Sequence, residues 1–185
     1  SHCDWSSDVC SSDLKKIVSL ISIGVLFMSC AKDNDVAVIS TQFGDMVVEL
    51  YPEVAPYHVE NFQILAKEGF FDGTTFHRII PGFMIQGGDP NSKDNDRMND
   101  GTGGRAGKYF GLGREDDPDS WLVPAEFNDS LHVRGTLSMA RTRNPNSASS
   151  QFFIFHAPQP ALDHQYTVFG KVISGMDVID QIVNA

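Results

Sequence analysis

The chain has 185 residues, of which 41% are hydrophobic, and this length suffices for one well-packed domain but not for two. Its formal net charge is −10, which argues against nucleic acid as the main partner because a phosphate backbone would repel it. The same charge predicts no attraction to anionic lipid headgroups. The three cysteines, Cys3, Cys10 and Cys30, all lie at the amino-terminal end, so we expect no disulfide after residue 30.

Residues 1–30 fall into two parts with different patterns. Residues 1–14 have no periodicity and are interpreted as a non-native leader resembling a translated adapter remnant, with a natural polar tail as the alternative. Residues 15–30 begin with two lysines and continue into an apolar run that is too short to span a bilayer of about 30 Å as a helix. This layout is typical of an export signal.

The end of the apolar run, Phe27–Cys30, resembles the lipobox of bacterial lipoproteins, although Phe27 stands where leucine is commonest. We therefore expect Cys30 to carry a lipid, with residues 31–35 as a short polar tether. The alternative is an ordinary signal peptide with an incidental cysteine. The predicted location is the cell envelope, with the protein lipid-anchored at the periplasmic face or the cell surface.

Residues 36–185 form the one predicted domain. Runs rich in β-formers at Val36–Ser40 and Met46–Tyr51 predict an opening hairpin, and apolar positions at helical spacing between Pro56 and Gly69 predict a helix. A second helix is predicted at the carboxyl end, and further strand character occurs at Glu126–Phe127, Arg134–Ala140, Gln151–Phe155 and Tyr166–Val172. Short strands, two helices and no βαβ alternation favour a closed antiparallel barrel or a sandwich over a parallel sheet.

The stretch Phe76–Asp89 is predicted to be a hairpin with a Pro-Gly turn. Arg78 and Gln86 stand where a core strand would carry aliphatic side chains, and buried polar groups are costly without partners. Alternation places Met84 on the face of Gln86 and turns His77 away from Arg78, which favours a structural role for His77. The hairpin therefore predicts a binding surface.

Five motifs occur along the chain: Phe-His-Arg-Ile-Ile-Pro-Gly-Phe-Met-Ile-Gln-Gly-Gly-Asp (76–89), Gly-Thr-Gly-Gly (101–104), Gly-Thr-Leu-Ser-Met-Ala (135–140), Ser-Gln-Phe-Phe-Ile (150–154) and Val-Phe-Gly-Lys-Val (168–172). In this order they resemble the motifs of cyclophilins, a family of peptidyl-prolyl cis–trans isomerases. The resemblance implies a mainly β fold, a closed eight-stranded antiparallel barrel capped by two α-helices. It also implies isomerase activity on proline-containing polypeptides, without a cofactor. We expect a monomer.

The resemblance assigns site residues one by one. The catalytic positions are Arg78, Phe83 and Gln86, and the hydrophobic proline pocket falls on Phe83 together with Met84, Phe153 and Leu162. The other positions expected to contact substrate are Gly101, Ala140, Arg141, Thr142, Gln151 and Tyr166.

The residue types suit this chemistry. When an X-Pro bond twists, the prolyl nitrogen regains a lone pair and becomes a hydrogen-bond acceptor, and a permanently charged guanidinium such as that of Arg78 can donate to it. The alternative for Arg78 is a salt bridge at the rim. The alternative for the whole domain is a proline-peptide binding or chaperone module with little turnover.

Several positions depart from the family pattern. Ala161 precedes Leu162 where well-known eukaryotic members carry a tryptophan that donates to cyclosporin, so tight binding of that drug is not expected. Tyr166 replaces a common histidine, and Arg141 stands at the usual asparagine, where its charge can alter peptide preference. The polar segment 90–120 is longer than in compact members.

Two other ligand types are disfavoured. The glycine-rich segment 101–108 lacks the P-loop pattern, because Thr102 and Tyr109 occupy positions that need glycine and a hydroxyl residue. The acidic run after Asp94 is broken by Met98 and Asn99, so it does not form a calcium loop of the EF-hand type. We expect no bound metal.

Overall fold

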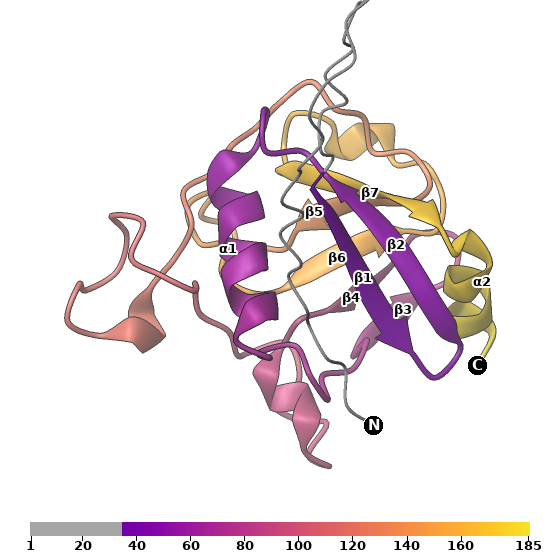
Figure 1. Cartoon of the computed structure of the whole chain (residues 1–185), viewed down its shortest axis with the longest axis horizontal. Helices are drawn as coiled ribbons and strands as arrows, with labels where there is room; N and C mark the ends of the chain where they lie inside the picture. The colour runs from indigo at the N-terminus through magenta and orange to yellow at the C-terminus, as the bar shows by residue number, and fades with distance from the viewer. Residues whose placement is uncertain (1–34) are drawn as a thin grey trace, which may run out of the picture. The chain divides into compact units, whose positions relative to one another are not determined.

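A computed structural model describes residues 35–185. The predictions for residues 1–34, including the lipidated Cys30, lie outside the described residues. Figure 1 shows the chain as a sheet flanked by helices. The elements are β1 (Val36–Thr41), β2 (Gly44–Leu50), α1 (Pro56–Lys67), β3 (Arg78–Ile80), β4 (Met84–Gly87), β5 (Thr136–Met139), β6 (Phe152–Phe155), β7 (Val168–Ser174) and α2 (Met176–Asn184). Three 3₁₀ turns are η1 (Pro90–Lys93), η2 (Pro118–Ser120) and η3 (Pro160–Leu162).

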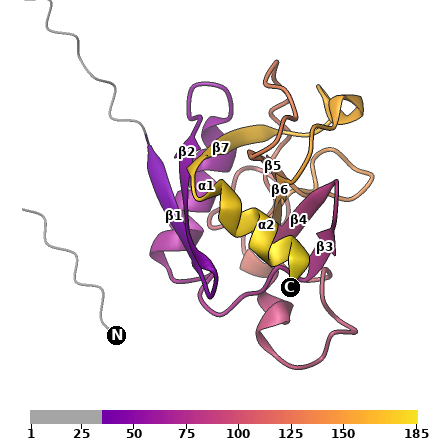
Figure 2. The ribbon, with the colours of Figure 1, turned by 90° about the vertical axis from the view of Figure 1, so that its right-hand side faces the viewer.

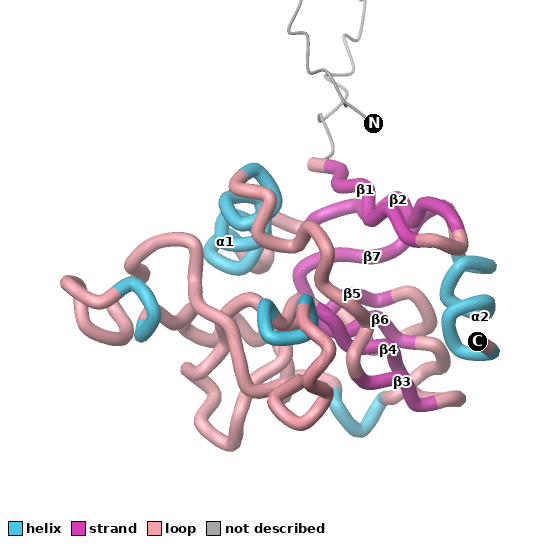
Figure 3. Tube along the Cα trace, turned by 90° about the horizontal axis from the view of Figure 1, so that it is seen from below, coloured by secondary structure: helices cyan, strands magenta, loops and turns pink. Residues whose placement is uncertain are grey.

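The strands form one antiparallel sheet of seven strands in the order β1-β2-β7-β5-β6-β4-β3. Figure 3 shows the strands following one another in this order, with α1 and α2 at opposite ends of the strands. Helix α2 contacts both β2 and β3, and Figure 2 shows it lying across that end of the sheet. The mainly β class and the two helices agree with the sequence prediction.

The prediction of a closed eight-stranded barrel is wrong. Strands β1 and β3 are the two edges of the sheet and do not pair with each other, and a cavity of about 410 Å³ lies between β1 and segment 71–76. Segment 71–76 cannot close the gap as a strand because its backbone is used in local turns: the Thr74 N–H donates to the Phe71 carbonyl at 3.1 Å. The strand predicted at Glu126–Phe127 is also absent from the described structure.

Helix α1 begins with Pro56 at its first position, as predicted. The preceding residue, Ala55, has no side chain that can cap the helix. Instead the Glu126 carboxylate accepts the backbone N–H of Tyr57 at 3.0 Å and of His58 at 2.9 Å. Glu126 thus caps α1 from 68 residues away rather than forming a strand, and the helix is anchored to the loop before β5.

The sheet separates two apolar clusters because successive side chains of a strand point to opposite faces. On the inner face, Ile85, Leu137 and Ile154 are fully buried beneath α1 and α2 in the main core. On the outer face, Met84, Phe153 and Phe155 form a second, smaller buried cluster. The alternation predicted for residues 151–155 is confirmed, and the smaller cluster is the floor of the candidate site.

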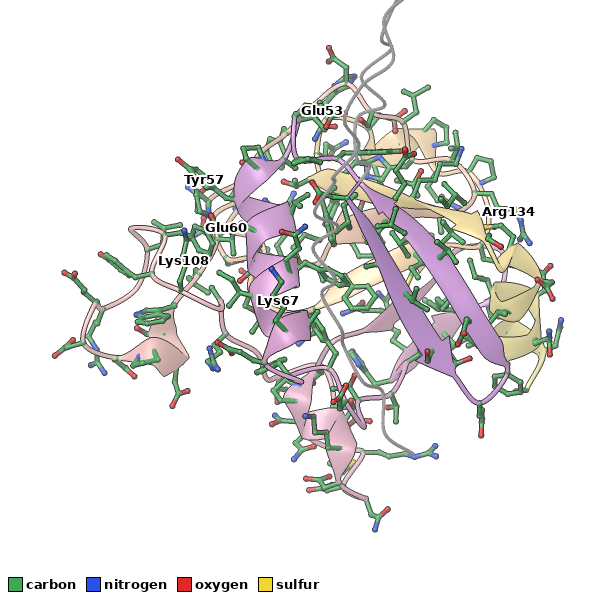
Figure 4. All side chains as sticks on the ribbon, viewed as in Figure 1. Glu53, Tyr57, Glu60, Lys67, Lys108 and Arg134 are labelled. Atoms are coloured by element: carbon green, nitrogen blue, oxygen red, sulfur yellow. The ribbon has the colours of Figure 1, made fainter. Side chains whose placement is uncertain are left out.

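The long segment 90–120 is irregular but is held against α1. The Asn61 side chain is fully buried, accepts the Gly107 N–H at 2.7 Å and donates to the Ser149 carbonyl at 2.7 Å. Lys108 pairs with Glu60 of α1 at 2.5 Å (Figure 4). In the residues from 35 onward, no helix is long and apolar enough to cross a membrane. In the same residues, no three potential metal-ligating side chains gather.

Candidate active site

The register of three neighbouring strands builds the wall of the site. Arg78 of β3 pairs with Gln86 of β4, which in turn pairs with Phe153 of β6. Paired residues lie on the same face of a sheet, so these three side chains form one row. The turn between β3 and β4 sets this register: Gly82 has φ +73°, a conformation that favours glycine.

These side chains surround a cavity of about 230 Å³, which is called the apolar cavity below after its floor. Its floor is Met84 and Phe153, which are 1% and 6% exposed. Phe153 packs edge-on against Tyr166, with ring centroids 5.7 Å apart. The complete lining is Arg78, Phe83, Met84, Gln86, Ala140, Arg141, Phe153, Leu162 and Tyr166.

A directional chain of hydrogen bonds leads away from the guanidinium. Arg78 Nη1 donates to Gln86 Oε1 at 3.3 Å, and Gln86 Nε2 donates to Gln151 Oε1 at 3.0 Å. Gln151 Nε2 donates to the Gly103 carbonyl at 2.7 Å. Each amide thus accepts on one side and donates on the other, which holds the row in place and leaves other guanidinium donors of Arg78 free.

The Arg78 side chain is exposed, and no carboxylate of residues 35–185 lies within 4.0 Å of it. A rim salt bridge, the structural alternative for Arg78, is therefore not formed in the described part of the chain. The positive charge faces the cavity uncompensated.

A second and larger cavity of about 540 Å³, called the wide cavity, adjoins the first. It shares Arg78, Gln86 and Arg141 with the apolar cavity. Its complete lining is His77, Arg78, Gln86, Arg97, Asp100, Gly101 and Arg141. The two cavities together form a continuous, partly apolar and partly cationic surface along β3 and β4.

A family model described as cyclophilin-type peptidyl-prolyl cis–trans isomerase matches residues 36–185. The chain belongs to the cyclophilin family. A probable peptidyl-prolyl cis–trans isomerase of Brucella suis is 44% identical over 163 residues, which are 88% of this chain and 79% of the relative. A peptidyl-prolyl cis–trans isomerase of Acinetobacter baylyi is 38% identical over 175 residues, 91% of this chain and 82% of the relative.

Among solved structures, a cyclophilin-type isomerase of Cryptosporidium parvum, determined in the presence of the dipeptide Ala-Pro, is similar with a TM-score of 0.68. It is 33% identical, and the match covers 81% of this chain and 85% of that protein. This cyclophilin is a peptidyl-prolyl cis–trans isomerase.

Nine of the twelve residues predicted to contact substrate line the apolar cavity of this cyclophilin. Gly101 lies on the wide cavity instead. Gln151 lines neither cavity and reaches the site through Gln86. Thr142 also lines neither: its backbone N–H and its hydroxyl both bond to Ser147 within their own loop, at 2.9 and 2.8 Å. Ala161, at the family's tryptophan position, is exposed and outside both cavities.

Three cavity residues were not predicted. Arg97 and Asp100 lie in irregular backbone, where no strand or helix period indicates which way a side chain points. His77 was expected to face away from Arg78, but it precedes β3, where strict alternation does not apply, and it contributes to the same wide cavity. The rim of the site therefore carries more charge than the motifs indicate.

The Leu162 side of the cyclophilin pocket is held by a hydrogen-bonded pair of His132 and Asp163. His132 is buried and packs edge-on against Phe155, with ring centroids 5.1 Å apart. It bonds to Asp163 through its backbone N–H and its Nδ1, each at 2.8 Å. The bond from the His132 backbone, followed by the bond from its ring, lowers the pKa of Asp163. Because Asp163 directly follows η3, this pair positions Leu162.

Proposed function

We propose that this isomerase binds the proline ring of a polypeptide in the apolar cavity, against Phe83, Met84, Phe153 and Leu162. The cavity of about 230 Å³ is below the range of about 300–1,000 Å³ common for drug-sized ligands, which suits a single small ring. The observation that carries the proposal is the free guanidinium of Arg78 beside this buried apolar floor.

In the proposed mechanism no covalent bond forms or breaks. Rotation about an X-Pro bond faces a barrier of about 20 kcal/mol, whereas cis and trans differ by only about 1 kcal/mol. Holding the ring and the flanking backbone leaves the peptide bond as the element that rotates. Arg78 then donates to the prolyl nitrogen, which accepts a hydrogen bond only when the amide is twisted, so Arg78 stabilises the transition state more than either planar state.

The polar neighbours are assigned supporting roles. Gln86 and Gln151 orient the guanidinium through the hydrogen-bond chain, and Gln86 also faces the peptide backbone. Ala140, Arg141 and Tyr166 complete the lining of the apolar cavity. We propose that Gly101 borders the path of the bound polypeptide beyond its proline. The loop containing Thr142 is proposed to contact the same polypeptide through backbone groups.

The test is steady-state isomerisation of a proline tetrapeptide by wild type, Arg78→Ala and Arg78→Lys. We expect Arg78→Ala to lower kcat/KM about a hundredfold, the size of effect seen when one donor to a transition state is removed. Arg78→Lys should fall between, because lysine keeps the charge but lacks the rigid fork of donors. Both substitutions are at an exposed position, so unchanged circular dichroism is expected.

The control is Lys67→Ala, which removes an exposed cation at the end of α1 that lines neither cavity. Its kcat/KM should equal that of wild type. Equal activity of wild type and Arg78→Ala would remove Arg78 from the mechanism.

We further propose that Cys30 carries a lipid and that the protein assists the folding of exported proteins at the cell envelope. The support is the sequence of residues 15–30, two lysines and a short apolar run that ends at Cys30. A monomer is proposed because one chain supplies every residue that lines the apolar cavity.

A further inference from the structure

Positive charge is concentrated on the wide cavity although the chain as a whole is acidic. The net charge of the full sequence is −10, yet three arginines line this one cavity and Asp100 is its single carboxylate. Such a cavity attracts a negatively charged group, because one carboxylate does not cancel the positive charge of three arginines.

The three arginines of the wide cavity lack acidic partners, a property they share with Arg143 but not with the other three arginines of residues 35–185. Arg105, Arg114 and Arg134 each pair with a carboxylate. In contrast, Arg78, Arg97 and Arg141 have no carboxylate oxygen within 4.0 Å anywhere in residues 35–185. Their charges are therefore available to a bound molecule.

Arg141 is also held in a defined position. Its guanidinium lies over the Tyr166 ring at 4.3 Å and donates to the carbonyls of Thr142 at 2.9 Å and Gln165 at 2.8 Å. These partners are neutral, so they fix the side chain without cancelling its charge. A cation held in place loses little side-chain freedom when it binds a carboxylate.

The buried carboxylate that contacts Gly101 of the wide cavity does not neutralise the arginines. Asp89 is fully buried and accepts the backbone N–H of Asn91 at 2.9 Å and of Gly101. Its carboxylate thus holds the loop that carries Gly101 and does not pair with an arginine. Asp100 remains as the one opposing charge on the cavity wall.

We propose that the wide cavity selects substrates with a glutamate or aspartate side chain close to the proline. This rests on the proposed function, in which the proline occupies the apolar cavity. The two cavities share Arg78, Gln86 and Arg141, and an extended chain advances about 3.3 Å per residue, so an acidic side chain one or two residues from the proline reaches the arginines. The preferred partners are thus acidic segments of unfolded polypeptides.

The test uses a peptide series that differs at one position at a time. Glutamate, glutamine or lysine is placed at each of the two positions before and the two positions after the proline, and kcat/KM and Kd are measured for each peptide. At one or more positions we expect the glutamate peptide to exceed the glutamine peptide about fivefold in kcat/KM, with lysine lowest, because an exposed ion pair contributes about this factor. The ratio should fall towards one at about 1 M salt, where the Debye length is about 3 Å.

Two variants and a matched control locate the effect. Arg97→Gln should reduce the glutamate-to-glutamine ratio, and Asp100→Asn should increase it, because the cavity then loses its only negative charge. Lys67→Gln makes the same charge change on α1, outside both cavities, and should leave the ratio at the wild-type value.

A glutamate-to-glutamine ratio of one at all four positions would overturn the inference. An equal fall of that ratio in Arg97→Gln and Lys67→Gln would also overturn it, because it would indicate a general effect of net charge. Failure of wild type to turn over the glutamine peptides contradicts the proposed function instead. In that case the Kd values still test the acidic preference.

Discussion

At the scale of single residues, the orientation of the Arg78 side chain depends on its neighbours. Its side chain is exposed, and a free arginine at such a position would sample many rotamers. The chain from Arg78 through Gln86 and Gln151 to the Gly103 carbonyl restricts it. The two glutamines therefore act as one unit and not as two independent contacts.

This coupling predicts non-additive effects of substitution. Gln151→Leu alone should lower kcat/KM by about tenfold or less, the range expected for one hydrogen bond between neutral groups. Gln86→Leu should lower kcat/KM further because Gln86 also lines the apolar cavity. The double variant should be no worse than Gln86→Leu, since either change already interrupts the same chain. Losses that multiply in the double variant would contradict the shared chain.

At the scale of elements, α1 depends on a cap that is distant in sequence. Burial alone would raise the pKa of the Glu126 carboxyl, but bonds from the His58 ring and from the N–H groups of Tyr57 and His58 hold its pKa below the ordinary value of 4.5. The unfolded chain therefore binds this proton more readily than the folded chain. The stabilisation is complete above the ordinary pKa and is lost as the pH falls through the lower, folded pKa.

We accordingly expect Glu126→Gln to lower the free energy of unfolding by about 1 kcal/mol at neutral pH, a typical value for loss of a helix cap. The difference between variant and wild type should shrink as the pH falls below 4.5. Urea unfolding at a series of pH values measures this difference in the free energy of unfolding. Glu115→Gln, at an exposed position, is the control and should leave stability unchanged. A difference that grows on acidification would contradict the assignment.

At the scale of the whole molecule, the domain is proposed to work at a membrane surface through Cys30. Wild type produced in a bacterial host should partition into the detergent phase, and Cys30→Ala into the aqueous phase. Intact mass should show the lipid on wild type and not on Cys30→Ala. Cys3→Ala, which removes a cysteine from the same end of the chain, is the control and should partition as wild type does. Aqueous partitioning of wild type would contradict lipidation.

The parts of this fold that sequence could predict are those governed by short-range periodicity. The alternation of β4 and β6 correctly separates Met84 and Phe153 from the core residues Ile85 and Ile154. The motifs likewise indicate most of the apolar cavity.

Other features depend on long-range choices that no period records. The sheet stays open because segment 71–76 uses N–H groups in turns. Glu126, although it is next to the β-former Phe127, caps helix α1 and is not part of a strand. Arg97 and Asp100 reach the wide cavity from irregular backbone, so their position depends on how segment 90–120 is held on α1.

The most direct test of the central claim separates binding from rotation in one experiment. Exchange NMR on a proline peptide in the presence of protein measures both occupancy of the apolar cavity and the rate of cis–trans interconversion on the protein. For Arg78→Ala we predict a peptide that still binds, with chemical shifts of Phe153 and Leu162 perturbed as in wild type, but interconverts about a hundredfold more slowly. Interconversion at the wild-type rate in that variant would contradict the claim that Arg78 stabilises the twisted amide.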